Sequence, residues 1–391
     1  MIKNKIFITL FFLGTFVYLP AQNLEEILQQ IQQNNKELQV LQKEKEASNM
    51  GIKARNNISP LSVQYSPFYA TGVKGLASSE LIVSQDFDFP SLYAARYKSG
   101  LLQQQVLDLQ YLIARRDILF KAKFFCLDLI RLNKEKALLA ERCKNADELL
   151  LLFEKRFKEG DATILEMNKV KMDRMNVQTE VLQNESLRKT IEQSLLILNG
   201  NQPVSFQSIE YPIMKLDDFN KVYNDYLNSA LTLKTAQTSV RASFQDVQVN
   251  KQNWLPKLQV GYRRNMDFGE VSNGFLVGAS IPLFSNRNLL KMAKARYVGA
   301  QLQLDNTQLQ VETQVRMLFN QKQQLQKTIE IYDVNLLQNT LGLLRKAVEQ
   351  GRLSIIEYYI EADDIYKNMQ AYLEIENHYQ KVLAEIYKNE L

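Results

Sequence analysis

Histidine and cysteine, which often carry out acid–base and metal chemistry, are scarce in this chain of 391 residues. His378 is the single histidine, and it lies close to Glu374 and Glu376 in a stretch with helical periodicity. A solvated helix face explains this histidine better than a catalytic role, because the sequence has neither a His/Cys cluster with metal spacing nor a Ser/His/Asp arrangement. It also has no glycine-rich phosphate loop. The sequence therefore predicts no enzyme, no metal site and no cofactor.

The sulfur-containing residues point to helix packing. Cys126 and Cys143 lie 17 residues apart in one helical stretch. In a straight helix that spacing is about 25 Å, which is too far for a disulfide. Met167, Met172 and Met175 are close enough to suggest a soft-metal patch, but packing in a helical core is favoured.

Residues 1–21 have the pattern of a secretory signal peptide. Lys3 and Lys5 precede a mostly apolar run at 6–18, and Ala21 offers a cleavage site. The alternative is a membrane anchor, but a run of 13 residues is shorter than the roughly 20 that span a bilayer. No other apolar run reaches 18 residues, so no transmembrane helix is predicted. Cleavage would leave 46 Lys and Arg against 43 Asp and Glu, a near-balance that does not favour a nucleic-acid partner.

Proline and glycine are spaced so widely that very long helices are required. No proline lies between Pro90 and Pro203, and none follows Pro282. Many-stranded sandwiches and most α/β folds need turns far more often than this. The fold class expected is therefore mainly α.

The order of segments repeats once along the chain. Each half has a helical segment, a pair of short alternating segments, a long helix, a glycine turn and a further helix. Residues 95–97 match 295–297 as Ala-Arg-Tyr, and the turn at 160–166 corresponds to 351–357. We therefore predict a first repeat at 22–200, a linker at 201–217 and a second repeat at 218–391.

Four segments alternate between apolar and polar residues, which is the period of a half-buried strand. They cover about 61–70, 79–89, 257–266 and 272–283, and turn-like connections join them into two hairpins. Strands of about ten residues have the length that crosses an outer membrane. A soluble two-stranded hairpin is the alternative, but a lone hairpin is marginal in water. The residues expected to face lipid are Leu61, Val63, Tyr65, Leu81, Val83, Phe87, Leu258, Val260, Tyr262, Phe275, Val277 and Ile281.

The long helices have coiled-coil spacing, and each is followed by a glycine. Gly160 and Gly351 each end one helix and precede renewed helical pattern, which is typical of a helix–turn–helix tip with glycine at the C′ position. One uninterrupted helix that tolerates a glycine is the alternative. The recurrence of the glycine in both halves argues against it.

Taken in order, these motifs resemble the TolC-like outer membrane efflux protein family over essentially the whole chain after residue 21. The motifs that carry the resemblance are Phe89-Pro90, Ile281-Pro282-Leu283-Phe284, Phe157-Lys158-Glu159-Gly160, Val348-Glu349-Gln350-Gly351 and Leu198-Asn199-Gly200. Residues 87–90, Phe-Asp-Phe-Pro, are similar to the branch that accompanies heavy-metal resistance-nodulation-division pumps.

The resemblance implies a homotrimer in which each subunit gives four strands to one 12-stranded outer-membrane β-barrel, continued by a periplasmic α-helical coiled-coil tunnel. Physical reasoning agrees, because four strands with open edges cannot stand alone in lipid. The family's glycine turns are the periplasmic tips that meet an adaptor protein. By position, the adaptor-contact residues here are Gly160, Asp161, Ala162, Gly351, Arg352 and Leu353.

The family also has acidic residues just past the second turn, where they ring the periplasmic entrance. Glu357 matches one such position, and Glu166 is its equivalent in the first repeat. The next family position is Ile360 here instead of an acid, so a double acidic ring is not expected.

The function expected is a passive exit duct in the outer membrane of a Gram-negative bacterium. Its partners would be outer membrane lipid, a periplasmic adaptor (membrane fusion) protein and an inner-membrane pump of the resistance-nodulation-division type. The alternative is a periplasmic coiled-coil adaptor or scaffold, which would also contain helical hairpins. An adaptor should have one central hairpin flanked by Gly- and Pro-rich β domains, and this sequence instead repeats its plan twice.

Overall fold

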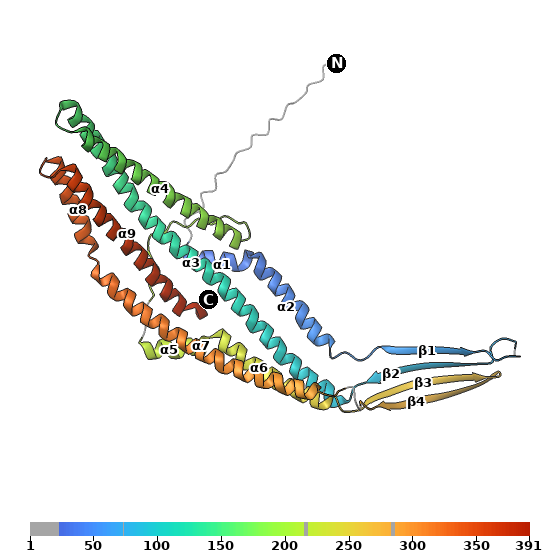
Figure 1. Cartoon of the computed structure of the whole chain (residues 1–391). Coiled ribbons are helices and arrows are strands. Elements are labelled where there is room, and N and C mark those ends of the chain that lie inside the picture. Colours follow the sequence, from blue (N-terminus) through green and yellow to red (C-terminus); the bar gives the residue numbers. More distant parts are fainter. Residues whose placement is uncertain (1–22, 73, 215–217, 283–285) are drawn as a thin grey trace, which may run out of the picture. The chain divides into compact units, whose positions relative to one another are not determined.

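The computed structural model describes residues 23–72, 74–214, 218–282 and 286–391. The predicted signal peptide lies outside these residues, as do parts of the linker and of the Ile281–Phe284 motif. The helices are α1 (Leu24–Asn34), α2 (Lys36–Ala54), α3 (Pro90–Glu159), α4 (Ile164–Leu198), α5 (Phe219–Ser229), α6 (Leu231–Gln252), α7 (Leu289–Ile331), α8 (Val334–Glu349) and α9 (Ile355–Ile386), followed by a 3-10 turn, η1 (Lys388–Glu390) (Figure 1).

The chain forms two compact units, and each takes segments from both repeats. Unit 1 consists of the chain up to Asn34, Ala122–Ile213 and Asp333–Asn377. Unit 2 consists of Asn35–Lys121, Met214–Tyr332 and His378–Leu391. The repeats are therefore intertwined rather than folded as separate domains.

The four strands form one antiparallel sheet in unit 2, with the order β1-β2-β3-β4. The strands are β1 (Leu61–Phe68), β2 (Ser78–Phe87), β3 (Lys257–Asp267) and β4 (Glu270–Ser280). Their ends lie within three residues of the predicted ones. The two hairpins join because β2 of the first repeat pairs with β3 of the second.

The predicted order of elements is confirmed, but the second repeat differs from the first in its long helix. In the first repeat α3 runs without a break for 70 residues, whereas the long helix predicted to end at Gly351 is divided into α7 and α8. Tyr332 is extended, with φ −83° and ψ 113°, and the Asp333 side chain accepts a hydrogen bond from the backbone N–H of Leu336 at 2.9 Å. A short acidic side chain that caps a new helix competes with continuation of the old one, which explains why the prediction of one helix is wrong here.

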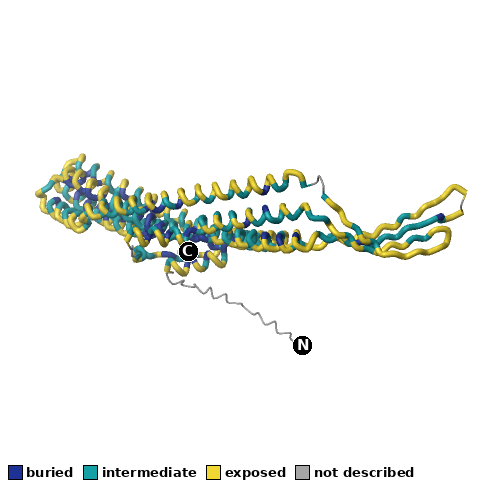
Figure 2. Tube along the Cα trace, turned by 90° about the horizontal axis from the view of Figure 1, so that it is seen from below, coloured by how far each residue is buried: buried dark blue, intermediate teal, exposed yellow. Residues whose placement is uncertain are grey.

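Buried apolar side chains lie mainly in the helices, while the strands are mostly exposed or half-buried (Figure 2). Unit 1 has a core to which α3, α4, α8 and α9 contribute, and it includes Leu149, Phe153, Val170, Val348, Ile355, Tyr358 and Tyr366. Two smaller clusters lie in unit 2, one around Val222 and Leu318 and one around Tyr226 and Val315. Packing of these buried side chains holds the long helices together.

The sulfur-containing residues follow the expected packing only in part. Cys126 is fully buried and Cys143 is half-buried, and both thiols are free. Burial raises the pKa of the Cys126 thiol to about 12, so this side chain stays protonated and inert. Met167 is buried, but Met172 and Met175 are exposed, so core packing was the wrong expectation for those two.

Two glycines of the helical regions should respond in opposite ways to alanine. Gly200 has φ +61°, and a Cβ on it would lie 2.4 Å from the backbone oxygen of Asn34. Gly299 lies within α7, where a Cβ would meet nothing within 4 Å. We expect Gly200→Ala to lower the free energy of unfolding by at least about 1–2 kcal/mol, and Gly299→Ala to raise it by about 0.5–1 kcal/mol. Thermal unfolding of the two variants measures this difference, and equal midpoints would contradict it.

Candidate functional site

The first tip is the turn between α3 and α4, and its backbone has the geometry expected of a glycine turn. Gly160 has φ +83°, its N–H donates to the Phe157 oxygen at 3.2 Å, and the Asp161 N–H donates to the Arg156 oxygen at 2.8 Å. These two bonds form a Schellman motif, in which a left-handed residue satisfies the last carbonyl groups of a helix. Asp161 is exposed and Ala162 is half-buried.

The second tip, between α8 and α9, repeats this geometry. Gly351 has φ +68°, its N–H donates to the Val348 oxygen at 3.0 Å, and the Arg352 N–H donates to the Ala347 oxygen at 2.8 Å. Arg352 is exposed, whereas Leu353 is half-buried and packs against the unit 1 core. The prediction of two equivalent helix–turn–helix tips is confirmed as a matter of structure.

Glu166 and Glu357 occupy equivalent positions, and each completes a capping box at the start of the next helix. The Thr163 N–H donates to the Glu166 carboxylate at 2.7 Å, and the Glu166 N–H donates to the Thr163 hydroxyl at 3.2 Å. Ser354 and Glu357 make the same pair of bonds at 3.1 and 3.2 Å. The Ser/Thr-x-x-Glu spacing is the sequence signature of this cap, and it gives both acids a local structural role that our sequence analysis missed.

The capping bonds from Ser354 lower the pKa of the Glu357 carboxyl. A folded-state pKa below the unfolded one means that this stabilisation is complete above the unfolded pKa and is lost as pH falls through the folded pKa. Glu357 is therefore ionised at neutral pH. Ile360, which stands where the family has a second acidic residue, is exposed on the surface of this chain.

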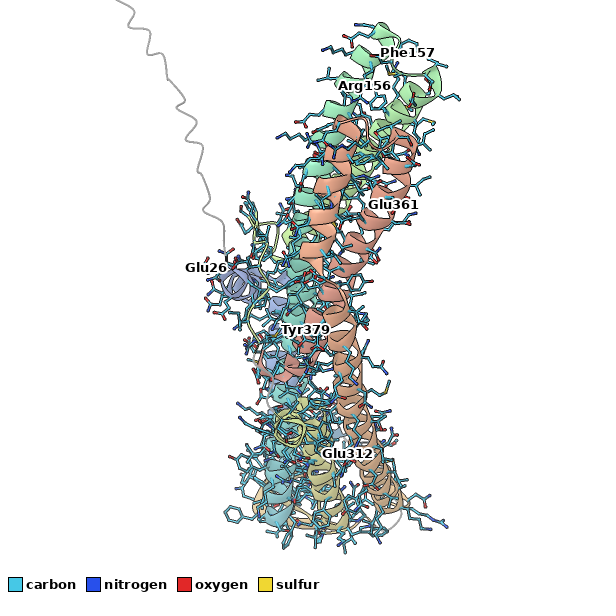
Figure 3. The ribbon with its side chains drawn as sticks, turned by 90° about the vertical axis from the view of Figure 1, so that its left-hand side faces the viewer. Glu26, Arg156, Phe157, Glu312, Glu361 and Tyr379 are labelled. Atoms are coloured by element: carbon cyan, nitrogen blue, oxygen red, sulfur yellow. The ribbon has the colours of Figure 1, made fainter. Side chains whose placement is uncertain are left out.

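Arg156 links the two tips, and the sequence analysis did not identify it. Its guanidinium donates to the backbone oxygens of Val348 at 3.3 Å and of Glu349 at 3.1 Å, in the last turn of α8. Figure 3 places Arg156 and Phe157 at the end of the α3–α4 hairpin. A cation at a helix C-terminus satisfies free carbonyl groups and the helix dipole. A basic residue near a helix end is a readable signal, but the sequence does not show that it serves a different helix.

A second arginine holds α3 and α4 to α9 within unit 1. The buried Arg142 donates to both carboxylate oxygens of Glu180, at 3.0 and 2.9 Å, and lies 3.5 Å from the Asp173 carboxylate. Its guanidinium also lies 4.6 Å from the centre of the Tyr366 ring on α9. Removal of one partner from such a buried pair leaves an uncompensated charge. The arrangement of the two helical hairpins therefore depends on Arg142.

The strand register places the predicted lipid-facing residues on one face of the sheet. Val63 pairs with Val83, Val83 with Tyr262, and Tyr262 with Phe275, and directly paired residues point to the same side. Phe275 and Val277 are 92% and 82% exposed. Ile281 lies one residue beyond the end of β4. That this apolar face contacts lipid stays a prediction.

The opposite face of the sheet is polar and carries its own ion pair. Arg263 pairs with Glu80 across β2 and β3. Gly261 lies on the same face, where a Cβ would come within 2.5 Å of the Val83 oxygen and 2.9 Å of the Ser84 Cβ. The two faces thus differ as the two sides of a barrel wall do.

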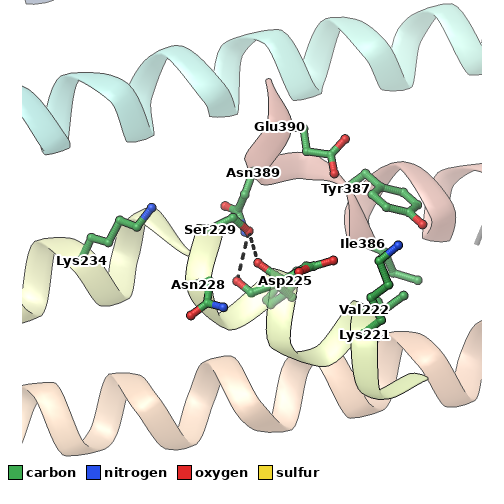
Figure 4. Close-up of a pocket in the computed structure, with 11 residues that line it drawn as sticks. Lys221, Val222, Asp225, Asn228, Ser229, Lys234, Ile386, Tyr387, Asn389 and Glu390 are labelled. Atoms are coloured by element: carbon green, nitrogen blue, oxygen red, sulfur yellow. Dashed lines mark hydrogen bonds between the residues drawn. The ribbon is translucent and has the colours of Figure 1, made fainter. Parts of the chain in front are cut away.

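A cavity of about 440 Å³ lies in unit 2 between α5 and the C-terminal end (Figure 4). Its wall includes Asp225, Ser229 and Glu390, and the Ser229 hydroxyl donates to the backbone oxygen of Asp225 at 2.7 Å.

His378 lies on an exposed face, as predicted, and its Nε2 atom lies 2.9 Å from the Nε2 atom of Gln321. Within the described ranges, no group of three His, Cys, Asp or Glu side chains could hold a metal ion. None of the helices described is long and apolar enough to cross a membrane.

Solved structures define the class of fold. The chain is similar to a membrane protein from Pseudomonas aeruginosa, with a TM-score of 0.76 and 15% identity over 94% of this chain and 90% of that one. It is also similar to the outer membrane protein VceC from Vibrio cholerae, with a TM-score of 0.75 and 18% identity over 94% of this chain and 95% of that one. The similarity to the Campylobacter jejuni CmeC outer membrane channel has a TM-score of 0.73 and 13% identity over 94% of this chain and 85% of that one. The fold is therefore that of TolC-like outer membrane channels.

A family model also matches part of the sequence. Residues 222–389 match the family model described as outer membrane efflux protein. A comparison with curated proteins gives no significant match. The resemblance to TolC-like outer membrane efflux proteins is thus confirmed, and this is a family of channels rather than of enzymes.

The facing of the strands is tested by a pair of neighbouring residues in β3. Val260 is on the apolar face and pairs with Val277, whereas Gln259 is on the polar face. We expect Val260→Arg to cost about 2–4 kcal/mol at mid-membrane depth and to lower the yield of assembled protein in the outer membrane. Gln259→Arg is the matched control and should assemble normally. Equal assembly of the two variants would show that the facing is wrong.

Proposed function

We propose that the protein is the outer membrane exit duct of a tripartite efflux system and passively conducts substrates from an inner-membrane pump across the periplasm and outer membrane. The match of residues 222–389 to the outer membrane efflux protein model carries this proposal. The channel fold agrees with it. Fractionation tests the proposal: a duct stays in outer membranes after an alkaline wash, whereas a periplasmic scaffold is released.

The working form in this proposal is a homotrimer. The described residues form four strands, and no strand among them lies beside the outer edge of β1 or of β4. Open edges are untenable in lipid, since every backbone group there must be hydrogen-bonded. Three copies would give 12 strands, which is enough to close a barrel that leaves a lumen. The polar face with Arg263 would line that lumen.

The two tips are proposed to dock a periplasmic adaptor protein, which connects the duct to a pump of the resistance-nodulation-division type. Both turns lie in unit 1, and apolar side chains are exposed beside them: Phe157, Ile164, Leu165 and Ile356. Exposed apolar groups rimmed by charge are typical of protein interaction sites. Arg156 would keep the two turns together for one partner.

Gly160→Val tests the docking role of the tips. A Cβ at Gly160 would meet nothing within 4 Å, so the variant suffers only the left-handed strain of about 1–2 kcal/mol. We expect a folded, membrane-inserted protein that no longer supports export of a pump substrate. Gly72→Val is the control, because Gly72 has φ +90° and equally open space in the hairpin loop between β1 and β2. Export that survives in both variants would overturn the docking role.

Glu357 is proposed to contribute to a ring of negative charge at the periplasmic entrance. Gln at this position of a capping box still accepts from the helix start, so Glu357→Gln removes the charge and keeps the turn. Three such carboxylates near a narrow axis would attract cations. We expect Glu357→Gln channels to show a lower cation preference in single-channel recordings. Glu166→Gln removes the equivalent cap charge in the first repeat and serves as the comparison, and an unchanged reversal potential in Glu357→Gln channels would show that Glu357 acts only as a cap.

A further inference from the structure

Positive charge is concentrated where the helices of unit 2 meet the sheet. Residues 47–60, 86–100, 246–258 and 286–300 flank the strands and contain ten Lys and Arg against three Asp. Their net charge of +7 exceeds the +5 of the whole chain. We name the exposed bases of these segments the basic collar: Lys53, Arg55, Lys98, Lys251, Lys257, Arg287, Lys291, Lys294 and Arg296.

The other end of the sheet lacks this charge. The two hairpin connections, residues 69–79 and 265–273, contain one Lys and two acids. All four strands enter or leave the sheet through the basic collar, because α2, α3, α6 and α7 adjoin it in sequence (Figure 1). The collar therefore marks one end of the sheet only.

Three bases lie near the start of α7. Lys291 lies in the first turn, Lys294 and Arg296 follow in the second, and no acid is present in the first turn. A helix N-terminus favours negative charge within its first turn, so the cation of Lys291 is unfavourable for the helix. The N-cap residue Asn288 also makes no side-chain capping bond. Among the described residues none of these three bases is in an ion pair, so their charge is available to an external anion.

Two of the three acids in these segments are already engaged by neighbouring side chains. Asp88 lies 2.6 Å from Arg96 and 3.7 Å from Lys257. Asp246 accepts hydrogen bonds from Ser99 at 2.5 Å and from Gln103 at 3.3 Å. Arg55 and Arg96 are among the residues that line a cavity of about 170 Å³ beside Asp246.

Aromatic side chains accompany the collar. The single tryptophan of the chain, Trp254, lies between α6 and β3 and is 45% exposed. Tyr97 in α3 is 61% exposed, and Phe89 is also exposed. Tryptophan and tyrosine with one apolar and one wet side are typical of the membrane–water interface.

We propose that the basic collar binds the anionic headgroups of phospholipids in the membrane leaflet on the helix side of the sheet. This inference rests on the proposed function, in which the strands cross the outer membrane. Each Lys or Arg near an anionic lipid surface is attracted to it, and the aromatic side chains supply the interfacial contacts. The hairpin end, which is weakly acidic, has no such preference, so the collar also fixes which end of the sheet lies in the anionic leaflet.

Trp254 provides the test, because a brominated acyl chain quenches tryptophan fluorescence on contact. The full-length protein is reconstituted in vesicles of phosphatidylcholine and phosphatidylglycerol in which either one lipid or the other is brominated. We expect quenching with both, and a preference for brominated phosphatidylglycerol of at least about fivefold, the equivalent of one base–headgroup contact. The preference should fall as ionic strength rises, because exposed charges are screened by salt.

The combined substitution Lys291→Gln, Lys294→Gln and Arg296→Gln should reduce the preference and leave the quenching itself in place. The control removes the same charge from exposed bases of unit 1 through Lys158→Gln, Lys171→Gln and Lys346→Gln, and it should retain the preference. The salt series on the unsubstituted protein needs no variant and remains decisive if a variant fails to fold.

The outcomes separate this inference from the proposed function. Equal quenching by the two lipids would overturn headgroup binding and leave the membrane placement intact. A preference that both triple variants lose equally would show a general charge effect and also overturn the collar. No quenching by either lipid would contradict the placement of the strands in the membrane, and with it the proposed function.

Discussion

The structure depends above all on how backbone N–H and C=O groups are satisfied where helices end. Gly160 and Gly351 adopt a left-handed conformation in which the backbone N–H groups of the turn bond to the last carbonyl groups of α3 and α8. Glu166 and Glu357 accept hydrogen bonds from backbone N–H groups at the start of the next helix. Each tip is thus closed within a few residues. The long helices reverse direction without a loop, which leaves the tip surface small and well defined.

The same constraint acts differently on the sheet. Among the described residues β2 and β3 have strand partners on both sides, whereas β1 and β4 have one each. Water satisfies such an edge in solution, but lipid does not. In the proposed membrane-spanning form the sheet is therefore the part that would need further copies, whereas the helices have buried cores of their own.

Charge is used for two purposes in different parts of the molecule. In unit 1, Arg142 and Arg156 are placed against carboxylates and carbonyl groups of other helices, and burial strengthens the contacts of Arg142. In the basic collar the bases are exposed. Lys53 and Lys251 lie in the last turns of α2 and α6, where the helix dipole favours a cation, whereas Lys291 lies in the first turn of α7, where it does not. The first arrangement stabilises the packing of unit 1, and the second is the surface that we propose for an external anion.

Local patterns in the sequence determined the repeat, the strands and the glycine tips, because period, turn residues and caps are properties of adjacent residues. They did not determine the break at Asp333, where one side-chain hydrogen bond competes with a continuous helix. The register of β2 against β3 and the contacts of Arg142 and Arg156 join segments that are far apart in the chain. Only the tertiary structure decided these, since many partners satisfy the same local pattern and packing selects one of them.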